Sequence, residues 1–77
     1  MSKTKDDRNG AALRRVTTRL RQVVRSTGGA DDFATAVGVS RQSVYNWTSG
    51  EFHPDLASII RISKVLELDA NWLLGLS

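Results

Sequence analysis

The sequence predicts a compact, all-α domain of five helices. Apolar residues recur from Leu13 onward at the three- and four-residue spacing of a helix face, and glycine, serine and aspartate residues divide this pattern into segments. No segment shows the alternation that is typical of a paired strand. The chain has 77 residues and no cysteine. We therefore expect one domain stabilised by a small apolar core, without disulfides or thiolate metal sites.

The N-terminal part of the chain divides into a polar segment and a long helix. Residues 1–9 carry no apolar anchor, so we expect a flexible basic arm there and a folded domain over residues 10–77. The first helix is expected from Ala11 to about Thr27, because two glycines follow. The helical spacing predicts five inward residues on it: Leu13, Val16, Leu20, Val23 and Val24.

Four shorter helices are expected after the glycine pair. They cover about residues 30–37, 41–48, 56–66 and 70–74. Ser40, Asp55 and Asp69 stand where N-cap residues belong. The expected inward residues are Phe33, Ala34, Val37, Val44, Trp47, Leu56, Ile59, Ile62, Ser63, Leu66, Trp72, and Leu73 or Leu74. This pattern leaves the polar residues of the third helix pointing outward.

The charge of the chain is distributed unevenly. Residues 1–25 hold eight of the eleven Lys and Arg residues and two acidic residues, which gives this segment a charge of +6. Residues 26–77 hold three basic and six acidic residues, a charge of −3. Such asymmetry suits a polyanionic partner on one side of the molecule, although a solvated helix face produces the same pattern.

Several classes of protein do not fit the composition. His53 is the single histidine and cysteine is absent, so the sequence offers no nucleophile–base pair and no set of metal ligands. We expect no catalytic residue, no cofactor and no metal. No apolar run approaches the roughly 18–20 residues that span a bilayer, and the first residues lack the apolar stretch of a signal peptide. A cytoplasmic protein is expected.

Two short helices joined by a glycine-containing turn describe a helix-turn-helix. Residues 33–50, FATAVGVSRQSVYNWTSG, resemble the helix-turn-helix of the lambdoid phage repressor and Cro proteins, the xenobiotic-response-element family. Pro54-Asp55-Leu56 and the residues up to Leu66, then Ala70 to Gly75, resemble the fourth and fifth helices of that family. The resemblance covers about residues 13–77.

The resemblance implies a sequence-specific transcription regulator, a prophage-type repressor or a Cro-like protein, that binds a palindromic operator in double-stranded DNA. Its recognition helix, residues 41–48, would lie in the major groove. The residues that would read bases are Arg41, Gln42 and Asn46, with Ser43 and Tyr45 at the flanks. Those expected at phosphates are Ser40, the amides near Gly50, and His53.

The chain departs from the family pattern at two positions. Ala30 stands where the family commonly has a glutamine that binds phosphate, and Glu51 stands where a lysine or arginine is frequent. Phosphate affinity then has to come from elsewhere. The first helix presents a stripe of Arg14, Arg21 and Arg25, and we expect these residues at phosphates.

Two other functions remain open on the sequence. An antitoxin-like module of the same fold would bind a protein partner, and a helical adaptor would bind protein without any role in DNA binding. If the protein binds DNA, we expect a weak homodimer, formed mainly on DNA and associated with the nucleoid. Its contacts would come from Ile60, Val65 and residues 74–76, with Phe52 as a loop anchor or a dimer contact.

Overall fold

The computed structural model describes residues 2–76, with side chains from Gly10 onward. It contains five helices in this range: α1 (Ser2–Thr27), α2 (Ala30–Val37), α3 (Arg41–Ser49), α4 (Leu56–Val65) and α5 (Ala70–Leu73). No strand is present among the same residues. The prediction of an all-α, five-helix domain is therefore confirmed.

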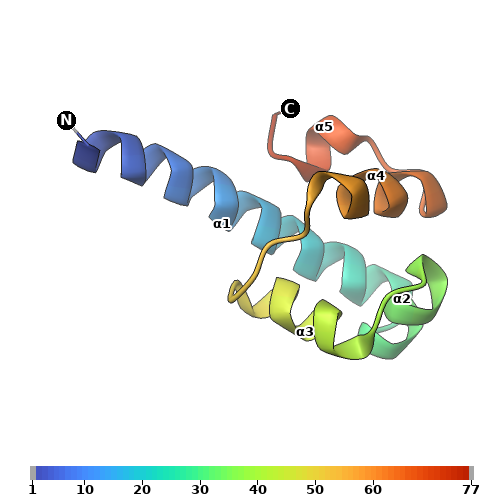
Figure 1. Cartoon of the computed structure of the whole chain (residues 1–77). Helices are drawn as coiled ribbons and strands as arrows, with labels where there is room; N and C mark the ends of the chain where they lie inside the picture. Colours follow the sequence, from blue (N-terminus) through green and yellow to red (C-terminus); the bar gives the residue numbers. More distant parts are fainter. Residues whose placement is uncertain (1, 77) are drawn as a thin grey trace.

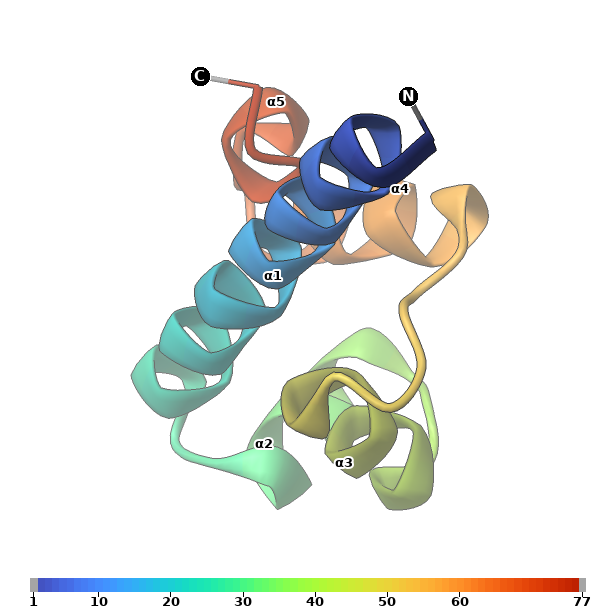
Figure 2. The same cartoon turned by 90° about the vertical axis from the view of Figure 1, so that its left-hand side faces the viewer.

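Helix α1 is the axis of the molecule. Helices α2 and α3 lie on one side of it, and α4 and α5 lie on the other (Figure 1). In the view turned by 90°, α4 and α5 lie at the top and α2 and α3 at the bottom (Figure 2), and α4 packs against α2 and α5. Helix α3 packs against both α1 and α2, while α5 joins α4 to α1. One face of α3 thus lies against the body of the protein, and the opposite face is directed away from it.

Helix α1 begins earlier than expected. The apolar pattern predicts a start at Ala11, but the helix runs from Ser2, so no break in the backbone separates the expected arm from the domain. Extending an existing helix needs no new nucleus, which makes its elongation through polar residues inexpensive. The N-terminal part of α1 projects beyond the other helices (Figure 1). Met1, the first residue of the expected arm, and Ser77, the last of the domain, lie outside the described residues.

The buried core is drawn from all five helices. It consists of Val16, Leu20, Val23, Val24, Phe33, Ala34, Val37, Val44, Trp47, Ile59, Ile62 and Leu73. Leu66, Trp72 and Leu74 are half-buried against it. Apart from two leucines, the apolar residues expected to face inward therefore lie in the core or against it.

The two exceptions are Leu13 and Leu56. The side chain of Leu13 is 43% exposed and that of Leu56 is 65% exposed, although both were expected to face inward. Each residue lies on the inward row of its helix, three residues before the first buried member of that row, Val16 or Ile59. Helical spacing identifies a face, but it does not determine how far along that face the other elements pack. Leu56 begins α4, and Leu13 borders a hollow beside Gly50.

The turn before α3 determines where that helix begins. Gly38 adopts a left-handed conformation, with φ of 81°, which glycine reaches without steric cost. Its amide donates to the carbonyl oxygen of Ala34 at 2.8 Å. Ser40 is the N-cap of α3, as expected, because its Oγ accepts from the amide of Ser43 at 3.0 Å. Asp55 and Asp69 cap α4 and α5 in the same manner.

Candidate nucleic-acid interface

Helix α3 is anchored through one face and open on the other. Val44 is completely buried and Trp47 is 8% exposed, and together they fix the helix against the core. On the other face Arg41, Gln42 and Tyr45 are exposed. Ser43 and Asn46 are half-buried. All five residues that the sequence assigned to base reading therefore belong to one short helix whose orientation is fixed by the core.

A pair of amide side chains lies on the outer face of α3. Nε2 of Gln42 donates to Oδ1 of Asn46 at 3.0 Å. The two residues are four positions apart, the spacing at which neighbours on a helix surface meet. This contact uses one donor of Gln42 and one acceptor of Asn46. The Gln42 carbonyl oxygen and the Asn46 amide group keep further hydrogen-bonding capacity.

Arg41 is held by two partners at the start of α3. Its Nε lies 2.6 Å from Oδ1 of Asp31, which comes from the first turn of α2. Its Nη2 donates to the hydroxyl oxygen of Tyr45 at 3.4 Å, and the guanidinium lies 5.8 Å from the centre of the Tyr45 ring. The Tyr45 hydrogen bond, followed by the Asp31 carboxylate, raises the pKa of Arg41 above its ordinary value. Arg41 is thus a permanent cation with a defined direction.

The other end of α3 borders a basic hollow. Gly10, Leu13, Arg14, Thr17, Thr18, Arg21, Ser49, Gly50 and His53 line it. The structure therefore brings Arg14, Arg21, Gly50 and His53, four of the residues expected at phosphates, to a single place. Nε of Arg21 donates to the carbonyl oxygen of Thr48 at 2.6 Å, a direct link between α1 and the last turn of α3.

The amides around Gly50 already have partners inside the protein. Gly50 N–H donates to the Trp47 carbonyl oxygen at 3.4 Å, and Phe52 N–H donates to that of Asn46 at 3.2 Å. The amide of Glu51 donates to Ser49 Oγ at 3.2 Å. These amides would contact an anion only by exchanging an existing hydrogen bond. In this hollow the cationic side chains of α1 and the ring of His53 are the more accessible groups.

A second hollow lies between the stripe of arginines and the start of α2. Arg21, Val24, Arg25, Gly29, Ala30, Tyr45 and Thr48 line it. Helix α2 has no side-chain hydrogen bond at its N-cap, so its first amides depend on other partners. Asp31 and Asp32 stand in this first turn, but the carboxylate of Asp31 is paired with Arg41.

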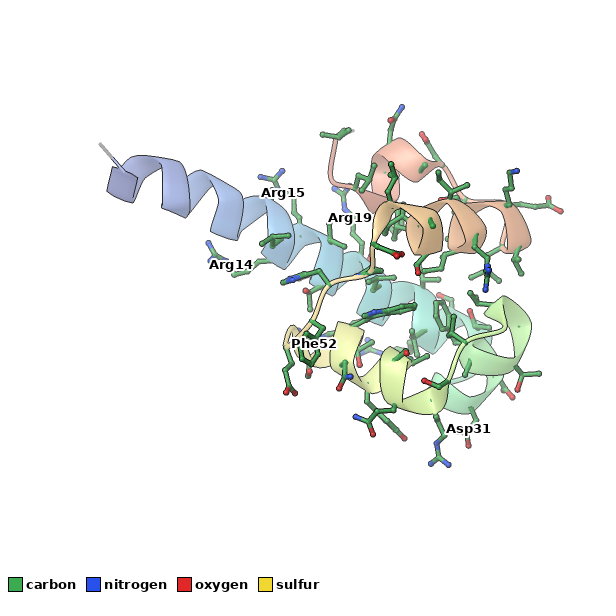
Figure 3. The ribbon with its side chains drawn as sticks, in the orientation of Figure 1. Arg14, Arg15, Arg19, Asp31 and Phe52 are labelled. Atoms are coloured by element: carbon green, nitrogen blue, oxygen red, sulfur yellow. The ribbon has the colours of Figure 1, made fainter. Side chains whose placement is uncertain are left out.

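The arginines of α1 are divided between two sides of the helix. Arg15 and Arg19 point toward α5, whereas Arg14 points the other way (Figure 3). Arg15 Nη1 donates to the Gly75 carbonyl oxygen at 3.2 Å. Arg19 Nη1 donates to the carbonyl oxygen of Trp72, with the guanidinium 5.1 Å from the centre of the Trp72 ring. Sequence reasoning did not find these contacts, because no local pattern connects residues more than fifty positions apart.

The described part of the chain lacks two other kinds of site. No three or more His, Asp or Glu side chains gather there as a metal-binding group. None of its helices combines the length and the apolar character needed to cross a membrane.

Comparison with known families assigns the fold. A family model described as helix-turn-helix matches residues 30–73, which is more than half of the chain. The chain belongs to the helix-turn-helix family, of the xenobiotic-response-element type. This family consists of DNA-binding regulatory domains. No curated protein and no solved structure matches the chain.

The family match divides the interface into two parts. Helix α3, with all five residues of the proposed base-reading face, lies inside the matched range. The stripe of Arg14, Arg21 and Arg25 precedes it. The family assignment therefore rests on the helix-turn-helix and the helices after it, and the stripe lies outside the matched residues.

Proposed function

We propose that the protein is a sequence-specific transcription regulator, a prophage-type repressor or a Cro-like protein, that inserts α3 into the major groove of operator DNA. One observation carries the proposal. Val44 and Trp47 fix α3 in the core, while Arg41, Gln42, Ser43, Tyr45 and Asn46 form a polar outer face. A major groove about 12 Å wide admits such a helix, and each base pair presents a distinct pattern of donors and acceptors there.

The base-reading roles follow from the chemistry of the side chains. Arg41 has the planar, charged fork that pairs with O6 and N7 of guanine. Gln42 and Asn46 carry the amide groups that pair with N6 and N7 of adenine. The hydrogen bond between them aligns the two amides before DNA is present. Ser43 and Tyr45 would contact the edges of neighbouring base pairs.

The phosphate contacts are proposed for the rim of α3. Arg14, Arg21 and His53 border the C-terminal end of α3, and Arg25 lies with Arg21 in the hollow beside Tyr45. Cations at these positions would face the DNA backbone when α3 occupies the groove. Ser40, at the N-terminal end of α3, would add a hydroxyl. Gly50 would add an amide once its bond to Trp47 is exchanged.

We further propose that two copies bind a palindromic operator and associate only weakly without DNA. The five helices use most of their apolar side chains in one core, which leaves little for a large interface. Ile60, Val65 and Leu76 are exposed, at 45%, 46% and 73%, and they are the proposed contacts. The two recognition helices would then lie about 34 Å apart, in successive major grooves.

The N-terminal segment is proposed to act as a mobile basic arm that adds non-specific affinity. The sequence places Lys3, Lys5 and Arg8 in it. This part of α1 projects from the packed body (Figure 1), and most of the stability of a protein helix comes from tertiary packing, which these turns lack. Binding through such an arm and through α3 would keep the protein in the cytoplasm, on the nucleoid.

The experiment that tests this function is a selection from random DNA duplexes at a stated salt concentration. The proposal expects an enriched motif of two half-sites related by a palindrome and bound far more tightly than bulk DNA. The matched control is a Gln42→Ala, Asn46→Ala variant, which keeps the core contacts of α3. Recovery of no motif from a folded protein would overturn the proposal and favour a protein-interaction module.

A further inference from the structure

The ion pair between Asp31 and Arg41 joins the two helices of the helix-turn-helix at their first turns. Arg41 Nε lies 2.6 Å from Asp31 Oδ1, and the two side chains are 62% and 68% exposed. Figure 3 shows Asp31 at the lower edge of the molecule, beside the outer face of α3. An ion pair this exposed adds little to folding stability. Its effect is therefore expected on the direction of Arg41 and not on the fold.

The pair occupies only one edge of the guanidinium. Arginine has five N–H groups in a planar fork. The Asp31 carboxylate is paired with Nε, and Nη2 donates once, to Tyr45. Nε and Nη2 share one edge of the fork, so both partners approach from the same side. The outer edge, formed by one N–H of Nη1 and the second N–H of Nη2, has no partner among the described residues and keeps two parallel donors.

The free edge has the geometry that guanine requires. Bidentate recognition of O6 and N7 uses two parallel N–H groups, and the outer edge supplies them without disturbing either existing contact. Without the Asp31 contact, the Arg41 side chain could adopt other orientations. It could rotate toward a phosphate or present its Nε edge to a different base.

We propose that Asp31 is a specificity-determining residue that positions Arg41, so that α2 contributes to base selection without touching a base. The inference rests on the proposed function, in which Arg41 reads the operator. It also gives a role to an acidic residue that would otherwise only repel DNA. Asp31 acts by orienting Arg41, which increases the discrimination between bases. Its negative charge lowers the affinity of the protein for DNA of any sequence.

Asp32 supplies a matched control. It is the next residue, carries the same charge and stands in the same first turn of α2. Its carboxylate lies against Gly28, and the ion pair with Arg41 is made by Asp31. Asp31→Asn and Asp32→Asn each remove one negative charge near the DNA and one acidic residue from the start of α2. Both variants should therefore bind all sequences more tightly, by similar factors.

The test is a base-preference profile for the wild type and for Asp31→Asn, Asp32→Asn and Arg41→Ala. We expect the guanine preference at the Arg41 base pair to fall by about two- to fivefold in Asp31→Asn, the range of an exposed ion pair. The preference should be unchanged in Asp32→Asn. Adding Asp31→Asn to Arg41→Ala should have no further effect on the profile, because the residue to be positioned is gone.

The outcomes separate this inference from the function on which it rests. If Arg41→Ala changes the profile but Asp31→Asn behaves like Asp32→Asn, the positioning role is wrong and the proposed function stands. If Arg41→Ala leaves the profile unchanged, the assignment of Arg41 to base reading fails first. A second readout needs no DNA: the Arg41 Nε–H group should be restrained on the nanosecond timescale in the wild type and mobile in Asp31→Asn. Equal mobility in both proteins would overturn the inference.

Discussion

Arg21 of α1 donates from Nε to the carbonyl oxygen of Thr48, 2.6 Å away at the last turn of α3. A cation at the C-terminal end of a helix is favoured by the helix dipole and satisfies a carbonyl that has no partner within the helix. The contact links the basic face of α1 to α3, the proposed recognition helix. The groups proposed to bind phosphate and those proposed to read bases are therefore parts of one rigid arrangement.

The stripe on α1 should determine how strongly binding depends on salt. Replacing Arg14, Arg21 and Arg25 by glutamine removes three cations beside α3. The slope of log affinity against log salt should become less steep by about one unit for each phosphate that the variant no longer neutralises, equally for all DNA sequences. Titrations of a labelled random duplex at several salt concentrations measure this slope. An Arg61→Gln, Lys64→Gln variant of α4 is the control, and an unchanged slope in the triple variant would show that the stripe is only a solvated face.

Arg19 should affect stability and leave DNA binding intact. Its guanidinium is half-buried, donates to the carbonyl oxygen of Trp72 and stacks near that ring. Arg19→Ala removes a charged hydrogen bond and a cation–π contact, and should cost about 1–3 kcal/mol of unfolding free energy. Denaturant unfolding measures the loss. A change in salt slope as large as that of an Arg25→Gln variant would place Arg19 at the DNA instead.

Trp47 should be essential for the fold. It is 8% exposed and packs α3 against the core. Trp47→Ala should lose roughly 3–5 kcal/mol, a large share of the stability of a small domain, and should abolish specific and non-specific binding together. Thermal unfolding followed by circular dichroism tests this. Tyr45→Ala, on the exposed face of the same helix, should melt close to the wild type, and equal melting temperatures for both variants would contradict the anchoring role of Trp47.

Ser63 offers a stabilising substitution. Its side chain is buried, and its Oγ has no hydrogen-bond partner among the described residues. Ser63→Ala removes a desolvated hydroxyl and adds helix propensity, so it should raise the unfolding free energy by about 1 kcal/mol. Ser58→Ala, at a half-buried position of the same helix, controls for propensity. A loss of stability in Ser63→Ala alone would mean that the hydroxyl is satisfied in solution.

The sequence predicted the segmentation of the chain well, because helix ends are local events. The start of α3 after Gly38 and Ser40 follows from a turn residue and a cap a few positions apart. The exposure of Leu13 and Leu56 could not be predicted, since periodicity identifies a face but not where its neighbours end. The start of α1 at Ser2 also differs from the apolar pattern.

The candidate site was predicted from the sequence only in part. The outward residues of α3 follow from helical spacing once Val44 and Trp47 are placed in the core. The partners with which these residues form contacts cannot be predicted from helical spacing. Asp31 contacts Arg41 because α2 and α3 pack against each other, which no local sequence pattern encodes. Arg15 and Arg19 donate hydrogen bonds to the C-terminal segment around α5, on a different side of α1 from Arg14. The net charge of the segment does not distinguish the arginines of α1. In the structure, two of them contact the α5 region and three border the hollows beside α3.

Whether α3 reads bases is decided by comparing the base-preference profile of Arg41→Ala with that of the wild type. Arg41 and its neighbours leave the N-terminal end of a helix fixed by the core, so they should determine sequence preference. We expect Arg41→Ala to lose about 1–3 kcal/mol of binding free energy on the selected operator, with relaxed preference at one or two base pairs and a much smaller loss on unrelated DNA. Coincident profiles for the two proteins, with the variant folded, would show that Arg41 does not read bases.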